Sequence, residues 1–321
     1  MPSTIFIATR GSPLALAQAN NLLAQCRDAF PGLAFDLKII KTTGDKLQTA
    51  SLAKEGESLP KGLFTKELEI ALLNNQADIA VHSLKDLPTE LPTGLMLGAV
   101  GKRADVRDVL IYRSAGLPGK RGFKPRLAIK DLPERAIVGT GSTRRKSQLL
   151  ELRPDLKIVE HRGNVLTRIK KLADIAELDA IVLAAAGLER LGFKIATDGK
   201  FTGEGVPEGL LATVLETDVM LPCVGQGAIG IETRQNDERI AAICEKINHP
   251  ETQQCVTAER AFLAEMGGGC QSPVAAYAEI QGDEICMRAV SFRDGPVRRA
   301  EAKRPVTEAA ELGKQLAEEL K

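Results

Sequence analysis

Short apolar strands that run through a polar turn into a helix recur along this 321-residue chain, and their alternation indicates an α/β fold. The first strand is predicted at residues 4–9, after which Ser12 and Pro13 supply a helix N-cap and a first helical residue. A second strand is predicted at 35–40. Such a βαβ unit implies a parallel or mixed sheet whose ligand site lies at the carboxyl ends of the strands, where Arg10 is found.

The next predicted strand places two further charged residues at the same edge. It covers residues 78–82 and leads into Lys85 and Asp86 before Pro88 stops regular structure. Because the carboxyl ends of parallel strands share one edge of a sheet, both side chains are expected to face the crevice that contains Arg10. Asp86 is then either a salt-bridge partner of Lys85 or a catalytic carboxylate.

Basic residues recur at the later turns. A strand at 136–138 leads into a helix that begins near Thr143, with Arg144 and Arg145 in its first turn. Basic side chains there oppose the helix dipole, so the pattern favours an anion held together with the free backbone N–H groups. Taken singly, each arginine is typical of a surface ion pair, but several in one cleft indicate a small polyanion. The later units add Arg162, Arg168 and Arg190.

Composition narrows the classes of ligand. Lys plus Arg number 43 against 42 Asp plus Glu, so a net charge of +1 provides no overall field that would attract nucleic acid or a membrane. Aromatic residues make up 3% of the chain and Trp is absent, which leaves few stacking platforms for nucleic acid. The three histidines are too far apart for a ligand motif, so we expect them to be structural and expect no metal site.

Six cysteines are scattered without a CxxC pair, and neither an export signal nor a run of about 18 apolar residues is present. We therefore expect a reduced, cytoplasmic protein that does not span a membrane. Cys270 follows three glycines, 267–269, between a predicted helix and a predicted strand. A lone cysteine is ordinarily a small buried residue, but the absence of bulk beside this one favours a thiol accessible to a large reagent.

At this point a set of motifs, in this order and over nearly the whole chain, closely resembles the porphobilinogen deaminase family, also called hydroxymethylbilane synthases. The motifs are IATRGSPLALAQA, KGLFTKELE, ADIAVHSLKDLP, VGTGSTRR, RGNVLTR, DAIVLAAAGLERLG, VGQGAIGIE, TAERAF and GGGCQSPVAAYA. The resemblance implies two α/β domains with mixed sheets, built like type II periplasmic binding proteins, and a small C-terminal α+β domain. The implied boundaries are 1–103 with 226–248, 104–225, and 249–321.

The resemblance also implies the activity of a transferase in tetrapyrrole biosynthesis. Porphobilinogen molecules, four in all, are joined head to tail with loss of ammonia on a dipyrromethane cofactor, and water then releases the product hydroxymethylbilane. The cofactor is attached by a thioether to the residue that Cys270 matches. A monomer is implied, with the product passed on to uroporphyrinogen-III synthase.

Residue roles follow from the same resemblance. Asp86 matches the catalytic carboxylate that serves the pyrrole nitrogens. The cofactor-binding positions match Ser12, Lys85, Ser142, Gly163, Arg144 and Arg145, in addition to Cys270. The substrate-binding positions match Arg10, Arg162, Arg168 and Arg190, with Lys61 and Phe64 as contacts from a lid. The polar stretch 42–62 is expected to be a long loop, either that lid or a disordered segment, and its sequence departs from the common family pattern.

Two other classes of protein are alternatives to this assignment, and each predicts sequence features that can be checked. A non-catalytic anion-binding protein of the same architecture predicts an export signal and has no need of Cys270. A cysteine-nucleophile transferase that forms a transient thioester predicts a base near the thiol, and the sequence of the loop contains no histidine.

Overall fold

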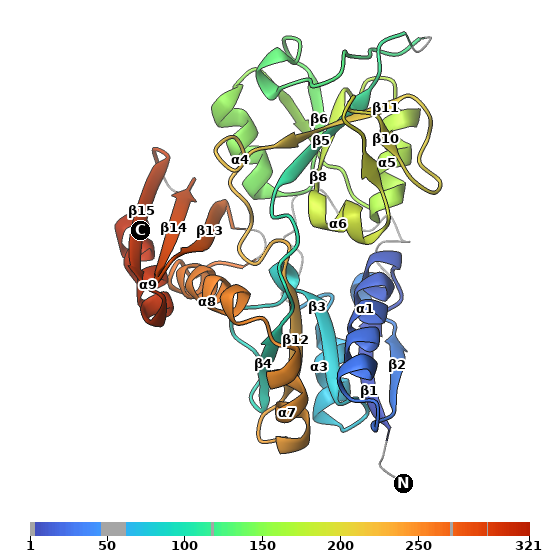
Figure 1. The fold of residues 1–321 in the computed structure, drawn as a ribbon. Coiled ribbons are helices and arrows are strands. Elements are labelled where there is room, and N and C mark those ends of the chain that lie inside the picture. The colour runs from blue at the N-terminus through green and yellow to red at the C-terminus, as the bar shows by residue number, and fades with distance from the viewer. Residues whose placement is uncertain (1–3, 46–61, 117–118, 270–271, 294) are drawn as a thin grey trace.

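The computed structural model describes residues 4–45, 62–116, 119–269, 272–293 and 295–321. These residues form three units, each built around its own sheet, which Figure 1 shows as a lower, an upper and a side lobe. The first and second units contain five-stranded sheets with both parallel and antiparallel pairs, and the third contains a three-stranded antiparallel sheet. The predicted fold class, two mixed-sheet α/β units and a small C-terminal α+β unit, is confirmed.

The first unit has the strand order β2-β1-β3-β12-β4. β1 pairs in parallel with β2 and β3, whereas β12 runs antiparallel to both β3 and β4. Helices α1 and α7 pack their apolar side chains on one face of the sheet, and α3 packs on the other. The elements are β1 (Ile5–Arg10), α1 (Pro13–Ala29), β2 (Phe35–Ile40), α3 (Lys66–Leu73), β3 (Ile79–Ser83), β4 (Leu95–Val100), β12 (Ile229–Arg234) and α7 (Glu238–Ile247).

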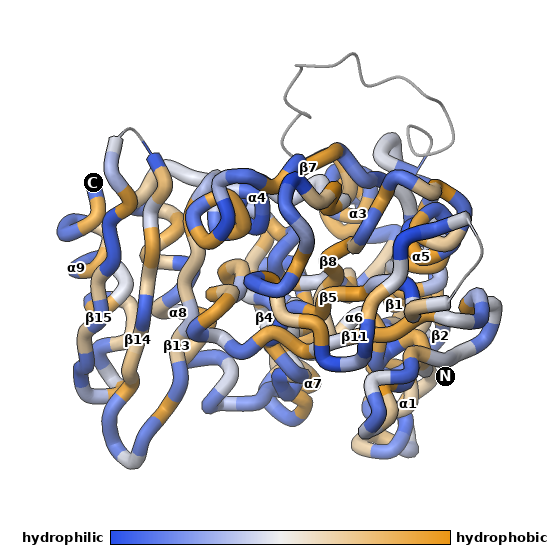
Figure 2. Tube along the Cα trace, turned by 90° about the horizontal axis from the view of Figure 1, so that it is seen from above, coloured by the Kyte–Doolittle hydropathy of each residue, from blue (hydrophilic) through white to orange (hydrophobic). Residues whose placement is uncertain are grey.

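The second unit has the strand order β11-β5-β8-β6-β7, with β6 parallel to its neighbours and β5 antiparallel to both of its own. Helix α4 covers one face, and α5 and α6 cover the other. Figure 2 shows β5 and β8 as largely hydrophobic between these layers. The elements are β5 (Asp108–Arg113), β6 (Ile137–Gly139), α4 (Thr143–Leu152), β7 (Lys157–Val159), α5 (Val165–Asp174), β8 (Ala180–Ala184), α6 (Ala185–Arg190), the small pair β9 (Lys194–Ile195) and β10 (Phe201–Thr202), and β11 (Leu210–Leu215).

The third unit packs two helices on one face of its sheet. Helices α8 and α9 cross so closely that a Cβ atom on Gly313 would lie 2.1 Å from the backbone oxygen of Ala258. The predicted hairpin at 281–283 is confirmed, whereas the closing helix begins at Ala309, two residues later than predicted, because Val306–Glu308 form a 3-10 turn. The elements are α8 (Pro250–Glu265), β13 (Val274–Gln281), β14 (Glu284–Ser291), β15 (Arg298–Pro305) and α9 (Ala309–Leu320).

The chain passes between the first and second units twice, once before β5 and once before β12, and the third unit is attached at these crossings (Figure 1). Arg103, in the first crossing, forms a two-pronged ion pair with Glu259 of α8, with 2.7 Å between Nη1 and Oε1. Glu259 also accepts a hydrogen bond of 2.7 Å from the N–H of Gly225 in the second crossing. A Cβ on Gly225 would lie 3.1 Å from Leu84 of the first unit, so all three units meet here.

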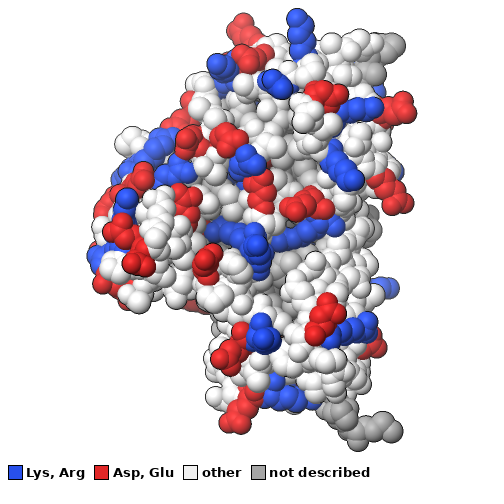
Figure 3. All heavy atoms as spheres, viewed as in Figure 1, with Lys and Arg blue, Asp and Glu red and all other residues white. Residues whose placement is uncertain are grey.

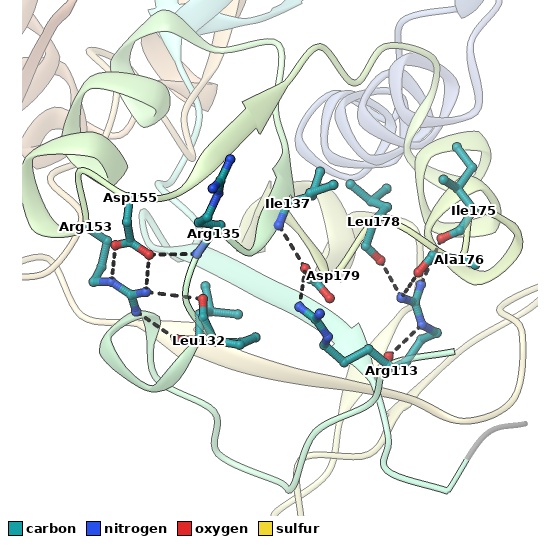
Figure 4. Close-up of polar contacts among 12 residues, drawn as sticks. Arg113, Leu132, Arg135, Ile137, Arg153, Asp155, Ile175, Ala176, Leu178 and Asp179 are labelled. Atoms are coloured by element: carbon teal, nitrogen blue, oxygen red, sulfur yellow. Dashed lines mark hydrogen bonds and ion pairs between the residues drawn. The ribbon is translucent and has the colours of Figure 1, made fainter. Parts of the chain in front are cut away.

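Two arginines far from the predicted site have purely structural contacts (Figure 4). Arg113 is fully buried and donates to the carbonyl oxygens of Ile175, Ala176 and Leu178, which it binds just beyond the end of α5. Arg153 forms a two-pronged pair with Asp155. The number of arginines therefore does not indicate how many of them are available to bind an anionic ligand.

Figure 3 shows basic and acidic side chains interspersed over one face of the molecule, in keeping with the net charge of +1. Within the described part of the chain, no helix is both long and apolar enough to cross a membrane. No group of three or more His, Cys, Asp or Glu side chains in those same residues is arranged to hold a metal ion.

Candidate active site

Lys85 and Asp86 lie in a 3-10 turn, η1 (Leu84–Asp86), which directly follows β3. β1 runs parallel to β3, so Arg10 ends at the same edge of the sheet. Gln18 of α1 donates a hydrogen bond of 2.9 Å to the hydroxyl of Ser83, which ties the first helix to this strand end. Asp86 is exposed at the end of an anchored strand, a position in which a ligand can reach its carboxylate.

Arg144 and Arg145 occupy the first turn of α4, as predicted, and both side chains are buried. They share the carboxylate of Asp108, the first residue of β5. Arg144 Nη2 lies 2.8 Å from Oδ2, and Arg145 Nη2 lies 2.7 Å from Oδ1. Each guanidinium also donates to a backbone carbonyl, that of Leu221 for Arg144 and that of Val182 for Arg145. One anion at this helix start is therefore supplied by the chain itself.

Asp108 joins α4 to the second crossing. Burial raises its pKa, but the charges of Arg144 and Arg145 and their hydrogen bonds outweigh that effect and hold the pKa well below the ordinary value for aspartate. Gln226, also buried, donates from Nε2 to Asp108 Oδ1 at 2.9 Å and to the backbone oxygen of Val106 at 2.7 Å. The orientation of the arginine pair thus depends on residues of both crossings.

Charges from the first and second units meet around Arg168 of α5. The pKa of Arg168 is lowered to about 10, chiefly by burial and then by the nearby charge of Arg145, while the charge of Asp86 opposes the shift. The pKa of Lys85 is likewise lowered by burial, raised by Asp86 and lowered by Arg145. These side chains therefore lie within electrostatic range of one another across two units. We call Lys85, Arg144, Arg145 and Arg168 the basic cluster.

Several carboxylates lie within electrostatic range of the basic cluster, those of Asp86, Asp108 and Glu160. Among the described residues, the buried Nε atoms of Arg144 and Arg145 nevertheless have no hydrogen-bond partner. Unused N–H donors on buried cationic side chains fit a ligand that carries carboxylates, because such a ligand could accept their hydrogen bonds.

Arg10 lies against Phe64, which the sequence predicted as a lid contact. The guanidinium carbon of Arg10 is 4.2 Å from the centroid of the Phe64 ring, and the same guanidinium pairs with Asp45. Burial raises the pKa of Asp45, but hydrogen bonds from Arg10 and Thr42 leave it below its ordinary value. Lys61, the other predicted lid contact, lies outside the described residues.

The remaining predicted residues are found at helix starts and turns. Ser12 and Ser142 are the N-caps of α1 and α4, and each hydroxyl accepts a hydrogen bond from the backbone N–H three residues later. Gly163 has a positive φ of 126°, a conformation that favours glycine, and its carbonyl accepts a 2.7 Å hydrogen bond from Arg168 Nε. Gly163 thereby fixes the stem of a member of the basic cluster.

Arg162 and Arg190 have different surroundings. Arg162 is exposed and pairs with Glu160, and its charge contributes to the lowered pKa of Arg168. Arg190, at the end of α6, donates from Nη2 to the backbone oxygen of Gly227 at 2.6 Å, so it contacts the second crossing. Arg162 therefore lies near the basic cluster, whereas Arg190 links α6 to the segment between the units.

Cys270 lies outside the described residues, so its role stays a prediction. Another thiol, that of Cys223, which the sequence analysis did not single out, lies near the basic cluster. Cys223 lies within electrostatic range of Lys85, Asp86 and Arg144; burial raises its pKa, and the two basic side chains oppose that shift. A thiol whose pKa is raised is a weak nucleophile, so the cleft chemistry has no evident need of it.

Asp108 and Gln226 were also missed. Asp108 begins a strand in which every residue is buried. A carboxylate at the head of an apolar strand was a usable signal, because a buried charge requires a partner, but nothing near it in the sequence identifies that partner. Gln226 gave a weaker signal, since one polar residue among the glycines of VGQGAIG is typical of an exposed turn.

The three histidines have structural contacts, as predicted. His82 Nε2 lies 2.9 Å from Oε2 of the buried Glu232 on the neighbouring strand. The ring of His161 lies 3.0 Å from the backbone oxygen of Arg168. His249 is the N-cap of α8.

Comparison with known proteins adds an independent line of evidence. The family model described as the porphobilinogen deaminase dipyromethane cofactor binding domain matches residues 5–242, and that of the porphobilinogen deaminase C-terminal domain matches residues 253–321. Porphobilinogen deaminase of Geotalea uraniireducens (strain Rf4) is 44% identical over 319 residues, which cover 99% of this chain and 91% of the relative. That of Geobacter metallireducens is 44% identical over 321 residues, with coverage of 99% and 92%.

Among solved structures, the effector binding domain of BenM with benzoate aligns at a TM-score of 0.40 and 17% identity, covering 76% of this chain and 90% of that one. A likeness of this size supports no conclusion. The family models and the relatives, by contrast, extend over almost the full length. The chain belongs to the porphobilinogen deaminase family, transferases of tetrapyrrole synthesis that work with a dipyrromethane cofactor.

Proposed function

We propose that the cleft between the first and second units is where this chain condenses four porphobilinogen molecules and releases hydroxymethylbilane by hydrolysis, with Asp86 as the catalytic carboxylate and Cys270 as the cofactor anchor. The observation that carries this proposal is that Asp86 lies beside Lys85 in the turn after β3 and within electrostatic range of Arg168, although Arg168 belongs to the other unit. A carboxylate inside an otherwise basic cleft suits a reaction that handles polyanions and develops positive charge.

Asp86 is assigned the electrostatic part of the reaction. Each condensation breaks the C–N bond of a porphobilinogen aminomethyl group, the nitrogen leaves as ammonia, and the methylene carbon becomes cationic through the pyrrole ring. A carboxylate held near the ring N–H stabilises this charge where it develops. The exposed position of Asp86 at the end of β3 supports this role, since the strand holds the backbone while the side chain remains accessible.

The basic residues of the site are proposed to bind the carboxylate groups of the cofactor and the substrate. When bound, the dipyrromethane would supply the free pyrrole carbon that forms the first new C–C bond and loses its proton, and the ring added last would supply that carbon for each later bond. Lys85, Arg144, Arg145 and Arg168, with the N-cap Ser142, would hold the acetate and propionate groups of the cofactor. Ser12 and Gly163 would complete this cofactor contact, and Arg10, Arg162 and Arg190 would bind the substrate side chains. Phe64, beside Arg10, and Lys61 would serve as contacts from the lid.

The finer organisation belongs to the same proposal. We place domain boundaries at 1–103 with 226–248, at 104–225 and at 249–321, supported by the separation of the two five-stranded sheets and the three-stranded sheet. A monomer in the cytoplasm, which hands its product to uroporphyrinogen-III synthase, agrees with the family assignment.

The test of the anchor is the mass of the peptide that contains Cys270, released from active enzyme. We expect the added mass of two linked pyrrole units on that peptide. An unmodified Cys270 in fully active protein would refute the covalent cofactor, and a modification on Cys223 instead would move the anchor to that thiol. A thioester intermediate would differ from both, because hydroxylamine cleaves a thioester and leaves a thioether intact.

A further inference from the structure

The glycine loop that precedes Cys270 is closed by hydrogen bonds at both described ends. At the first end, the N–H of Gly267 donates to the carbonyl of Ala264 and that of Gly268 to the carbonyl of Leu263, which continues the last turn of α8. At the second end, Ser272 closes a small turn. Its N–H donates to the carbonyl of Gly269 at 2.9 Å, and the N–H of Gly269 donates to its hydroxyl oxygen at 3.1 Å.

One side chain joins the two ends. Arg293 follows β14, and the N–H of its neighbour Phe292 donates to the backbone oxygen of Pro273, which holds the two segments side by side. Arg293 Nη1 donates to the carbonyl oxygen of Met266, the C-cap residue of α8. Arg293 Nη2 donates to the hydroxyl oxygen of Ser272 at 3.1 Å. The planar guanidinium therefore bridges the residue before the glycines and the residue after Gln271.

Side-chain packing contributes little to holding Gly267 and Gly269. A Cβ added to either would contact no atom of the described residues within 4 Å. Gly268 is the exception, since a Cβ there would lie 2.6 Å from the Ser272 hydroxyl and 2.9 Å from Leu263. Glycine loses more conformational freedom on ordering than any other residue, so a run of three requires other constraints to hold one geometry.

We propose that Arg293 is a positioning residue for the reaction, because it fixes the separation of Met266 and Ser272, described residues on either side of Cys270. The inference rests on the proposed role of Cys270. Nη1 and Nη2 of Arg293 donate to Met266 and Ser272, so among the described residues Arg293 acts on the segment that bears the proposed anchor and not on the basic cluster. Such a residue affects kcat more than it affects KM for porphobilinogen.

The test compares Arg293→Met with Arg298→Met in the holoenzyme. Arg298 is an exposed residue of β15 in the same hairpin, so its replacement removes the same charge without touching the loop. We expect Arg293→Met to lower kcat about tenfold with an unchanged KM, because small misplacement of reacting groups is costly. We also expect faster hydrogen exchange at the amides of residues 267–269. Arg298→Met should match the wild type in all three.

Ser272→Ala removes one acceptor without removing a charge and should shift kcat and hydrogen exchange in the same direction as Arg293→Met, but less. Wild-type kcat and exchange in Arg293→Met would overturn the inference, as would a rise in KM with kcat unchanged. If Arg293→Met does not fold, Ser272→Ala decides in the same way. An unmodified Cys270 in the active wild type would refute the proposed function itself, whereas a modified Cys270 with an indifferent Arg293 would refute only the positioning role.

Discussion

Asp108 Oδ1 and Arg145 Nη2 lie 2.7 Å apart in the interior of the second unit, and the other oxygen of the same carboxylate faces Arg144. Arg144 and Arg145, which the sequence predicts to bind a ligand, are thus held in their orientation by the carboxylate of Asp108. Gln226 contacts the same oxygen from the second crossing, so the position of the pair depends on the segment between the units.

Replacing Asp108 by Asn should destabilise the fold, because two buried guanidinium groups lose their common counter-charge. We expect the free energy of unfolding to fall by about 3–5 kcal/mol, the range for breaking a buried ion pair. Urea denaturation measures it. Asp105→Asn is the matched control, because its pair with Arg107 is half-exposed and should contribute no more than about 1 kcal/mol. Equal losses in both variants would show that Asp108 has no special role.

The ion pairs of Asp108 also predict that the stability of the folded protein falls at acid pH. The pKa of Asp108 is lowered in the folded protein, so its ion pairs contribute their full stability above the unfolded pKa of about 3.9 and lose it as pH falls through the folded pKa. The free energy of unfolding should therefore decline below about pH 4 in the wild type. In Asp108→Asn this decline should be shallower, and an unchanged slope would contradict the assignment.

Arg168→Gln should weaken substrate binding without unfolding the protein. Arg168 is a partly buried member of the basic cluster, and burial and the charge of Arg145 together lower its pKa to about 10, so removing its charge relieves repulsion with Arg145. We expect KM for porphobilinogen to rise about tenfold or more, since a charge-assisted hydrogen bond contributes about 1.5–3 kcal/mol. Lys170→Gln, exposed on the same helix, should leave KM unchanged. A KM equal to that of the wild type in Arg168→Gln would remove it from the site.

Arg113→Met should lower stability while leaving KM alone. Its guanidinium satisfies backbone carbonyls just beyond α5, and their loss should reduce the free energy of unfolding by about 2–4 kcal/mol. Thermal unfolding with steady-state kinetics separates the two effects. Arg121→Met is the control, because Arg121 is exposed and pairs only at 3.3 Å with Asp179. A raised KM in Arg113→Met at full stability would show that this arginine serves the ligand.

The strand–turn–helix units could be predicted because their signals are local. A helix start can be predicted from a few adjacent residues, such as Ser12 with Pro13 or Ser142 with Thr143. Both serines are N-caps in the structure. β15 was missed because its sequence, RRAEAKRP, alternates charged residues with small ones on a sheet with one exposed face. β15 pairs with β14 because the two strands form a hairpin, and the periodicity of apolar residues does not predict this pairing.

The candidate site was predicted only in part. The sequence identifies Arg144 and Arg145 as basic residues at a helix start, but the contact of Arg145 with Asp108 joins positions 37 residues apart and depends on how β5 lies against α4. Arg113 is as basic as Arg145, yet it binds carbonyl groups of its own unit. Which arginines face a ligand is decided by such long-range contacts, for which residue type carries no signal.

Asp86 is proposed to be the carboxylate required for each addition of a porphobilinogen unit to the anchored cofactor. The most direct measurement is the intact mass of purified Asp86→Asn enzyme before and after mixing with porphobilinogen, beside the wild type and Glu90→Gln, an exposed acid in the same segment. The wild type and Glu90→Gln should gain pyrrole units in steps. Asp86→Asn should carry the cofactor and stay at that mass. Stepwise gain at the wild-type rate in Asp86→Asn would contradict the claim.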